Sequence, residues 1–481
     1  MPSLPRASRS HLPAHGERPH DAAAGPRLPP ARPGLAAVTF VTTPGNAAFV
    51  RAALRRGGAG DDAAVLELAY QAGGHAPAGG EAAEGVASAS SFAAFAEATS
   101  ALRPRFEEEL AALRPPASLL VADGFLYWAH ASAAALGVPS VSFLGTSAFA
   151  HVVREACVRD KPGAPASSPQ FDDATTAATT TYYTVPEFPH LQFSLRDLVP
   201  PPLPMIDLDA KMAAAVAASR GLVINTFHDL EGRYIEHWNQ HIGPKVWAIG
   251  PLWLAQQSSS SSSFFDTGSQ QLHTKPSWMQ WLDDMAAAGK SVLYISLGTL
   301  AAISQAQLKE VADGLDRAGV NFLWAVRPDN ADLGMGYEER VVGRGKVVRE
   351  WVDQRQILRH PYVRGFLSHC GWNSVLESIA AGVPLVAWPC EFEQPINAKF
   401  VVDELRIGVR VHVSDGVIGG FVKSEEITRA VKELMFGEAG TAMALRVTEI
   451  AAQAQLAVSD GGSSWKEVEE MISELCVVDN A

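Results

Sequence analysis

Short apolar runs rich in β-branched residues alternate with longer amphipathic stretches along almost the whole chain from residue 36 onward. The runs typical of buried strands lie at 36–42, 117–122, 139–143, 221–225, 291–296, 321–326, 363–368 and 384–387. Helical patterns follow most of these runs, for example at 46–56, 125–136, 230–241, 304–317 and 392–405. Strands that alternate with helices in this way predict doubly wound α/β sheets, which are parallel and covered by helices on both faces.

A break near the middle of the chain divides this alternation into two series. Gly250 and Pro251 form a turn signal, and six consecutive serines follow at 258–263. The length of 481 residues is also too great for one ordinary domain. We therefore expect an N-terminal domain over residues 35–249, a linker over 250–275, a C-terminal domain over 276–460 and a last helix within 461–481.

Residues 1–34 differ in composition from the rest of the chain. Proline and arginine are abundant, and the only acidic residues are Glu17 and Asp21. Transit peptides are also rich in arginine and poor in acids, but this density of proline opposes the amphipathic helix that such a peptide needs. Because no strand or helix period is visible, we expect the segment to be disordered.

Composition excludes several classes of function. The formal net charge is −13, so no general attraction draws the chain to nucleic acid or to an anionic membrane. The four cysteines lie far apart without a CxxC pair, which favours a reducing compartment, the cytoplasm, and argues against a disulfide framework or a zinc site. No apolar stretch is long enough to span a bilayer. An anionic ligand would have to be bound by local groups, such as a helix N-terminus.

Residues 351–394 contain the pattern from which function is predicted. An apolar strand at 363–368 runs directly into the turn HCGWNS at 369–374 and then into a helix that ends at Gly382. Asn373 or Ser374 is expected to cap this helix. Such a turn presents backbone N–H groups and the positive end of the helix dipole, which suit a diphosphate. His369, at the same edge, can donate a hydrogen bond to a phosphate oxygen.

The whole segment, WVDQRQILRHPYVRGFLSHCGWNSVLESIAAGVPLVAWPCEFEQ, closely resembles the signature box of plant secondary-product glycosyltransferases, which belong to the UDP-dependent glycosyltransferase superfamily. The resemblance extends from about residue 34 to the end of the chain. It implies the GT-B fold, in which two Rossmann-like domains face each other across a cleft. It also implies a UDP-sugar donor without a metal or other cofactor, a small hydroxylated acceptor, a monomer, and a last helix that packs back toward the N-terminal domain.

The resemblance assigns a role to each polar or aromatic position of the box. It implies that Trp351 stacks on the uracil beside Gln354, that Glu377 binds the ribose, that His369, Asn373 and Ser374 contact the diphosphate, and that Trp372, Glu393 and Gln394 hold the sugar. The family usually has aspartate where this chain has Glu393, so the carboxylate is kept with a longer reach. Gln394 resembles members that use glucose.

A second element supports the first. Residues 291–315 have the pattern of a buried strand, a Gly-Thr turn and a helix. Gly298 permits close approach of the backbone, and Thr299 offers a hydroxyl to a phosphate. This element resembles the strand and loop with which the family also contacts UDP. Further matches at 221–231 and 249–252 are expected to be structural.

Transfer without a metal requires a base for the acceptor hydroxyl and a carboxylate that orients the base. By resemblance, Asp123 at the end of the 117–122 strand is that carboxylate; otherwise it caps the helix that begins near residue 125. Thr146 matches a position that often faces the sugar. His20 lies roughly where the base belongs, although the first strand and the helix of the family are missing around it. The segment resembles an out-of-frame translation, a wrong gene start or a degenerate domain.

These features predict an inverting, metal-independent transfer of a hexose, expected to be glucose, to a hydroxyl of a flavonoid, phenolic or terpenoid. Residues 160–202 are expected to line part of the acceptor site. The alternative is a non-catalytic protein that binds a UDP-sugar because its base motif is disrupted. A GT-B epimerase or phosphorylase is a third interpretation, against which the box argues. The DxD sequence at Asp207 and Asp209 opens a helix and is expected to be structural.

Overall fold

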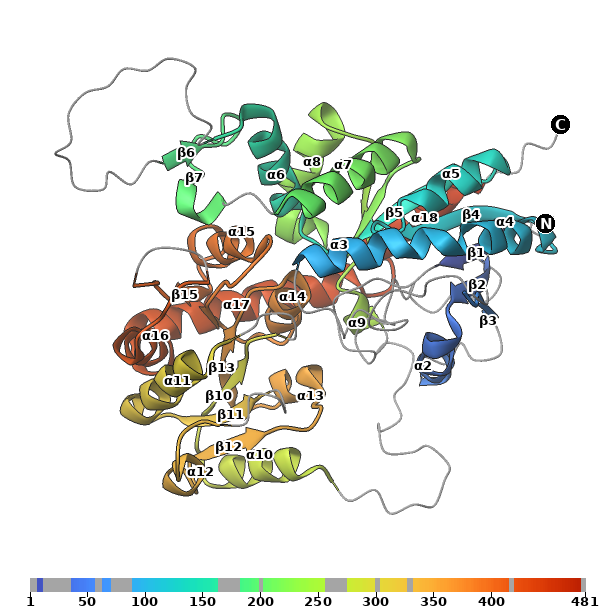
Figure 1. The fold of residues 1–481 in the computed structure, drawn as a ribbon. Helices are drawn as coiled ribbons and strands as arrows, with labels where there is room; N and C mark the ends of the chain where they lie inside the picture. Colours follow the sequence, from blue (N-terminus) through green and yellow to red (C-terminus); the bar gives the residue numbers. More distant parts are fainter. Residues whose placement is uncertain are drawn as a thin grey trace, which may run out of the picture.

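The computed structural model describes residues 7–11, 36–56, 63–70, 89–162, 182–198, 202–255, 275–298, 303–326, 332–414 and 419–476. At 7–11 it describes the backbone alone. Two parallel sheets, one from each half of the chain, are each covered by helices (Figure 1). The predicted architecture of two doubly wound α/β domains is confirmed.

The N-terminal sheet has seven strands in the order β3-β2-β1-β4-β5-β8-β9, all paired in parallel. They are β1 (Ala7–His11), β2 (Ala36–Thr42), β3 (Ala63–Glu67), β4 (Ala117–Asp123), β5 (Ser140–Leu144), β8 (Leu222–Ile224) and β9 (Val246–Ala248). The helices of this domain are α2 (Pro44–Arg56), α3 (Ala89–Ala98), α4 (Arg103–Ala112), α5 (Trp128–Ala135), α6 (Ala148–Asp160), α7 (Leu203–Ala218) and α8 (His228–His241). Strand β4 is buried along nearly its whole length, because helices cover both faces of the sheet.

The N-terminal segment differs from the expectation of disorder. Residues Ala7–His11 form β1, which pairs in parallel with β2 on one side and with β4 on the other. The expectations that residues 1–34 contain no strand and that the domain begins at residue 35 are therefore wrong. The sequence pattern misses β1 because ASRSH has one apolar residue, whereas a central parallel strand usually reads as a continuous apolar run. Residues 12–35, with His20, lie outside the described residues.

The C-terminal sheet has six parallel strands in the order β12-β11-β10-β13-β14-β15. They are β10 (Val292–Ser296), β11 (Asn321–Ala325), β12 (Gly345–Val348), β13 (Val363–Ser368), β14 (Leu385–Ala387) and β15 (Gly408–Arg410). The main helices are α10 (Ser277–Ala287), α11 (Gln305–Ala318), α13 (Gln354–Leu358), α14 (Trp372–Ala380), α15 (Gln394–Lys399), α16 (Ser424–Phe436) and α17 (Glu438–Ala457). The short helix α15 continues into a π-helical turn at Phe400–Glu404.

Two stretches between these elements are only partly described. The six serines of the expected linker lie outside the described residues, and the short helix α9 (Leu252–Ala255) precedes them. Within the expected acceptor region at 160–202, β6 (Tyr182–Thr184) and β7 (Gln192–Ser194) form a small antiparallel pair. In the described part of the chain, no helix has the length and apolar character needed to cross a membrane.

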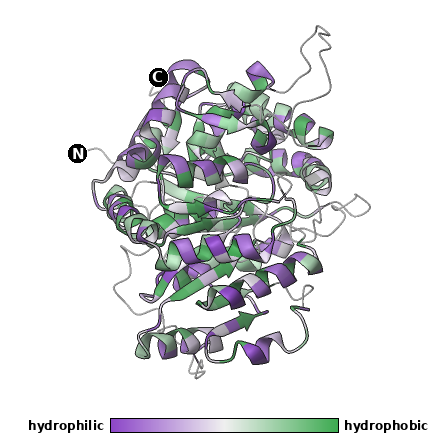
Figure 2. Ribbon diagram, turned by 90° about the vertical axis from the view of Figure 1, so that its left-hand side faces the viewer, coloured by the Kyte–Doolittle hydropathy of each residue, from purple (hydrophilic) through white to green (hydrophobic). Residues whose placement is uncertain are grey.

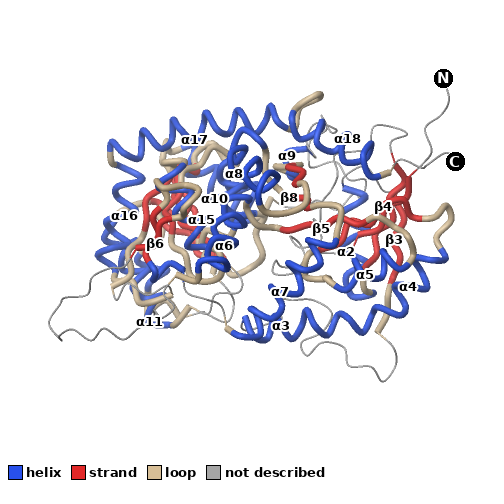
Figure 3. The backbone as a smooth tube through the Cα atoms, turned by 90° about the horizontal axis from the view of Figure 1, so that it is seen from above, coloured by secondary structure: helices blue, strands red, loops and turns tan. Residues whose placement is uncertain are grey.

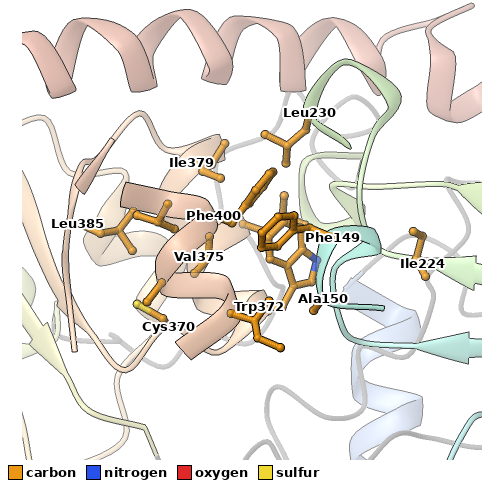
Figure 4. Close-up of a cluster of buried hydrophobic side chains, with 14 of the residues drawn as sticks. Phe149, Ala150, Ile224, Leu230, Cys370, Trp372, Val375, Ile379, Leu385 and Phe400 are labelled. Carbon is orange, nitrogen blue, oxygen red and sulfur yellow. The ribbon is translucent and has the colours of Figure 1, made fainter. Parts of the chain in front are cut away.

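One hydrophobic core runs through both domains. Figure 4 shows Phe149 and Leu230 of the N-terminal domain packed beside Trp372 and Phe400 of the C-terminal domain. The rings of Phe149 and Phe400 stack with their centroids 4.8 Å apart. Hydrophobic residues concentrate in the strands at the centre of each domain, and hydrophilic residues on the outer helices (Figure 2). The apolar contact between the domains therefore joins the cores of two domains that the sequence pattern predicts as separate.

Two helices at the end of the chain connect the domains. Helix α17 runs along one side of the molecule and leads to α18 (Ser463–Leu475), which lies against the N-terminal domain (Figure 3). Val468 and Met471 of α18 are buried in a cluster with residues of β4, β5, β8 and β9. Lys245 pairs with Glu470 and Glu474 at the edge of this contact. The last helix thus completes the cover of the N-terminal sheet.

Candidate functional site

The turn between β13 and α14 lies at the carboxyl end of the C-terminal sheet. Helix α14 begins at Trp372 with Gly371 at the N-cap, two residues earlier than a cap at Asn373 and three earlier than a cap at Ser374 would place it. Asn373 and Ser374 therefore belong to the first helical turn. The N–H groups of a first turn have no acceptor within their own helix, and they lie at the positive end of the helix dipole. This correction moves the predicted anion-binding groups onto the helix itself.

His369 is packed between two glycines from different loops. A Cβ atom at Gly298, which follows β10, would lie 3.0 Å from the His369 ring, and one at Gly371 would lie 2.6 Å from its Nε2 atom. Gly298 also has a φ angle of 79°, which residues with a side chain rarely adopt. The imidazole thus fills the space that both side chains would need. Thr299, the predicted phosphate contact after Gly298, lies outside the described residues.

Three further residues of the box form a hydrogen-bonded cluster. The Gln354 side-chain amide donates to Ser374 Oγ at 3.1 Å and to Glu377 Oε2 at 2.8 Å. The Tyr294 hydroxyl, from the neighbouring strand β10, donates to Gln354 Oε1 at 3.4 Å. Trp351, which precedes α13, keeps 39% of its side chain exposed. The structure therefore brings together the polar groups predicted for ribose and phosphate, next to an indole that is accessible at the surface.

The residues predicted to hold the sugar are placed differently from one another. Trp372 is only 1% exposed, and its indole N–H donates to the Asn225 carbonyl oxygen at 2.9 Å. The expectation that the Trp372 side chain binds the sugar is corrected, since its one polar atom is used between the domains. Gln394 is buried, and its Oε1 accepts from the N–H groups of Cys390 and Glu391 at 2.9 and 3.0 Å. Glu393 is half-buried, and burial raises the pKa of its carboxyl group.

Asn225 is a residue of this site that the sequence prediction passed over as structural. It follows β8 directly, and its side-chain amide donates to Asn373 Oδ1 at 3.4 Å. Its Oδ1 accepts from the Leu252 N–H at 3.0 Å. The carboxyl end of a parallel strand is the usual place for ligand contacts in such sheets. The position of Asn225 directly after a predicted strand could therefore have identified it as a site residue.

Asp123 lies at the carboxyl end of β4. Its side chain is 1% exposed and accepts a hydrogen bond from the Phe125 N–H at 2.9 Å. Burial raises the pKa of Asp123 to about 7, against which this hydrogen bond acts only in part. Strand β1 ends beside it, because His11 pairs in register with Val121, two residues before Asp123. His20 lies outside the described residues.

Thr146 contacts a histidine that the sequence prediction did not mention. Thr146 Oγ1 lies 2.6 Å from His151 Nε2, at the start of α6. Burial, together with the positive charge of Arg154, lowers the pKa of His151 to about 3. The imidazole is therefore neutral at physiological pH and can either accept from the threonine hydroxyl or donate to it.

The DxD sequence has a structural partner. Asp209, on α7, forms an ion pair with Arg154 of α6, whereas Asp207 is exposed. Helix α7 begins at Leu203, so both aspartates lie inside the helix rather than at its cap. Among the described residues, no group of three or more histidine, cysteine or acidic side chains is arranged to hold a metal ion.

Two Rossmann-like domains that contact each other, with a helix start at the carboxyl end of the second sheet, define a protein of the GT-B fold. Residues 245–453 match the family model described as UDP-glucoronosyl and UDP-glucosyl transferase. UDP-glycosyltransferase 90A1 of Arabidopsis thaliana is 39% identical over 83% of this chain and 81% of its own length. UDP-glucose flavonoid 3-O-glucosyltransferase 7 of Fragaria ananassa is 30% identical over 91% of this chain and 90% of its own length.

The chain therefore belongs to the plant UDP-glycosyltransferase family, and it is a UDP-glycosyltransferase. The structure of Glycyrrhiza uralensis UGT73P12, complexed with glycyrrhetinic acid 3-O-monoglucuronide, matches with a TM-score of 0.80 at 27% identity, over 98% of this chain and 96% of that one. Phytolacca americana UGT2, complexed with UDP-2fluoro-glucose and pterostilbene, has the same fold, with a TM-score of 0.73 at 23% identity over 98% of this chain and 100% of that one.

Proposed function

We propose that this enzyme transfers glucose from UDP-glucose to a hydroxyl group of a small aromatic or terpenoid acceptor, with inversion at the anomeric carbon and without a metal. The observation that carries the proposal is the cluster of Gln354, Ser374 and Glu377 beside the start of α14. This cluster supplies hydrogen-bond donors and acceptors for a ribose and a phosphate, and its three side chains are hydrogen-bonded to one another through Gln354.

The donor would be held by groups from three loops of the C-terminal domain. The N–H groups at the start of α14 and the imidazole of His369 would bind the diphosphate, and Thr299 would add a hydroxyl. Glu377 would accept from the ribose hydroxyls once Gln354 turns toward the uracil, on which Trp351 would stack. The acidic chain needs such local groups, because its net charge of −13 gives no general attraction for a nucleotide.

The sugar would be held next to α15. Glu393 and the amide nitrogen of Gln394 would bind its hydroxyls, and Thr146 would approach it from the N-terminal domain. Trp372 would contribute through its backbone N–H alone, since its indole is bound to Asn225. The Gln394 carbonyl oxygen is held by two backbone N–H groups, which fixes the direction of its amide nitrogen. This fixed direction supports selection of one arrangement of sugar hydroxyls, and we propose that of glucose.

Transfer would proceed by direct displacement. The acceptor oxygen forms a bond to the anomeric carbon while the bond from that carbon to the β-phosphate oxygen breaks, and the hydroxyl proton passes to a base. We propose a histidine of the stretch that leaves β1 as this base, with His20 as the predicted residue and His11 and His15 in the same stretch. Asp123 would orient the base and stabilise its charge. UDP leaves with its charge balanced by the helix start and His369.

The acceptor class rests on the relatives. Their names include a flavonoid 3-O-glucosyltransferase, an anthocyanin 3'-O-beta-glucosyltransferase and a scopoletin glucosyltransferase. The structural neighbour at 27% identity binds a terpenoid glucuronide. We propose that residues 160–202, including the β6–β7 pair, line the acceptor site of this chain.

Calorimetric titration with UDP tests the donor site. His369→Ala should weaken UDP binding by about tenfold or more, because a hydrogen bond to a charged group is worth about 1.5–3 kcal/mol. Cys370→Ala is the matched control, since burial raises the pKa of this thiol to about 12 and it carries no charge toward the phosphates. Equal affinities of the two variants would contradict the assignment.

A transfer assay separates the enzyme from a binding protein. UDP release should be measured with UDP-glucose, a panel of phenols and excess chelator, and the rate should not depend on the chelator. Alanine variants of His11, His15 and His20 then identify the base, whose loss should abolish transfer but leave UDP affinity within twofold. Binding of UDP-glucose without transfer to any acceptor would instead support the non-catalytic alternative.

A further inference from the structure

The turn that begins α14 is held from the other domain as well as from its own. Asn225, after β8, accepts the Trp372 indole N–H at its carbonyl oxygen and donates its side-chain amide to Asn373 Oδ1, at 2.9 and 3.4 Å. Two consecutive residues of the first turn of α14 are thus bound to one residue of the N-terminal domain.

Asn225 is itself fixed in place. Its Oδ1 accepts from the Leu252 N–H at 3.0 Å, and a side chain at Gly250 would collide with the same oxygen. The Gly250 carbonyl in turn accepts from Ser464 Oγ at the start of α18, at 2.5 Å. The orientation of the Asn225 amide is therefore set by the loop at 250–252, which the start of α18 holds in turn.

A second asparagine supports the same turn from the opposite side. Asn397, which is fully buried on α15, donates to the Cys370 carbonyl at 3.1 Å and accepts from Ser147 Oγ of the N-terminal domain at 3.1 Å. Cys370 has a φ angle of 66°, a conformation uncommon for a residue with a side chain. A turn in such a conformation persists only where its surroundings hold it.

We propose that Asn225 is a positioning residue for the diphosphate of the donor. It would hold Trp372 and Asn373 so that the N–H groups of the first turn of α14 and the Asn373 side chain point at the phosphate oxygens. Asn225 would then take part in donor binding without touching the donor. This inference rests on the proposed function, because it needs the diphosphate to lie at the start of α14.

The physical reason is that the affinity of an anion site made of backbone N–H groups depends on how well those groups are aligned with the anion. Hydrogen bonds weaken steeply when their angle departs from linear, and a shift of about 1 Å can cost about 100-fold in rate. A helix start that is held only by its own domain could shift relative to the N-terminal domain. The hydrogen bonds to Asn225 fix the start of α14 relative to that domain.

Asn225→Ala tests the proposal in the full-length enzyme. We expect UDP affinity in a calorimetric titration to fall by about three- to tenfold, as for loss of one hydrogen bond. The KM for UDP-glucose should rise in parallel, and the acceptor KM should stay within twofold. A role confined to folding would lower thermal stability without separating the two KM values.

Asn239→Ala is the matched control. This asparagine of the same domain also accepts a backbone N–H, that of Val246 at 2.8 Å, and it belongs to α8 rather than to the loop that meets α14. The Asn239→Ala variant should be less stable than the wild type but should bind UDP with the same affinity. Where Asn225→Ala folds poorly, Asn225→Asp keeps the acceptor for Leu252, replaces the donor to Asn373 by an oxygen and adds a negative charge, so it should weaken UDP binding more than Asn225→Ala.

A double-mutant cycle with Asn373→Ala decides whether Asn225 acts through Asn373. In the Asn373→Ala background, Asn225→Ala should weaken UDP binding by less than a further twofold. An effect of the same size in both backgrounds, or UDP affinity within twofold of the wild type for Asn225→Ala, would overturn the inference alone. A wild-type enzyme that does not bind UDP would overturn the proposed function first.

Discussion

At the proposed donor site, the position of a side chain depends on the absence of side chains at neighbouring glycines as well as on its own chemistry. His369 fits because positions 298 and 371 have no side chain, and either Cβ atom would meet the ring at 3.0 Å or less. The sequence predicts the histidine and one of these glycines as functional. It could not show that both glycines contact the same ring, since they come from loops more than 70 residues apart.

Asp123 makes a prediction about pH. Its pKa is raised to about 7 by burial, so its carboxyl group is charged above pH 7 and becomes neutral as the pH falls. If the charged form orients the base, kcat should decrease below pH 7. Asp123→Asn should lower kcat by about 100-fold to 10,000-fold and remove this acid limb, as expected for loss of an orienting carboxylate.

Steady-state rates between pH 5 and 9 measure this effect. Affinity for UDP, measured for Asp123→Asn at pH 8, is the control and should not change, because Asp123 lies in the other domain. A flat profile in the wild type, or an unchanged kcat in the variant, would return Asp123 to the simpler role of accepting the Phe125 N–H.

Among the elements, the patterns predicted types well and boundaries less well. The strands at 36–42 and 363–368 are found as expected because they are apolar runs, and the helix after Ser304 because it has an apolar period with Ser304 as N-cap and Gly319 as C-cap. Helix α14 starts earlier than its polar residues indicate, since a glycine serves as N-cap. Strand β1 was missed because pairing on both sides can hold a segment with little β-propensity of its own.

Helix α18 provides a prediction at this scale. Met471 is 1% exposed and packs on the N-terminal sheet, so Met471→Ala should lower the free energy of unfolding by about 2–5 kcal/mol. Lys466→Ala, on the exposed face of the same helix, should cost less than about 0.5 kcal/mol. Urea titrations followed by tryptophan fluorescence compare the two, and equal midpoints would show that α18 adds nothing to the fold.

In the whole molecule, one hydrophobic core shared by both domains makes their unfolding cooperative. Phe400 is buried against Phe149 and lies near Trp372, so it belongs to both domains at once (Figure 4). We expect the wild-type protein to unfold in a single transition. Phe400→Ala should cost about 3–5 kcal/mol and separate the transitions of the two domains.

Scanning calorimetry measures this directly. Phe436→Ala removes an exposed phenylalanine of the C-terminal domain and serves as the control, which should keep one transition near the wild-type temperature. Two resolved transitions already in the wild type would show that the contact between the domains is too weak to couple them.

The sequence by itself determined the architecture and the family, and it predicted the donor box, because these depend on periodicity and on residues that lie close together in the chain. The tertiary structure alone decided that the Trp372 indole is bound between the domains, that Asn225 reaches Asn373, and that β1 fills the centre of the first sheet. Each of these contacts joins residues more than 25 positions apart. No local pattern encodes such contacts, since they arise only when the helices and strands pack.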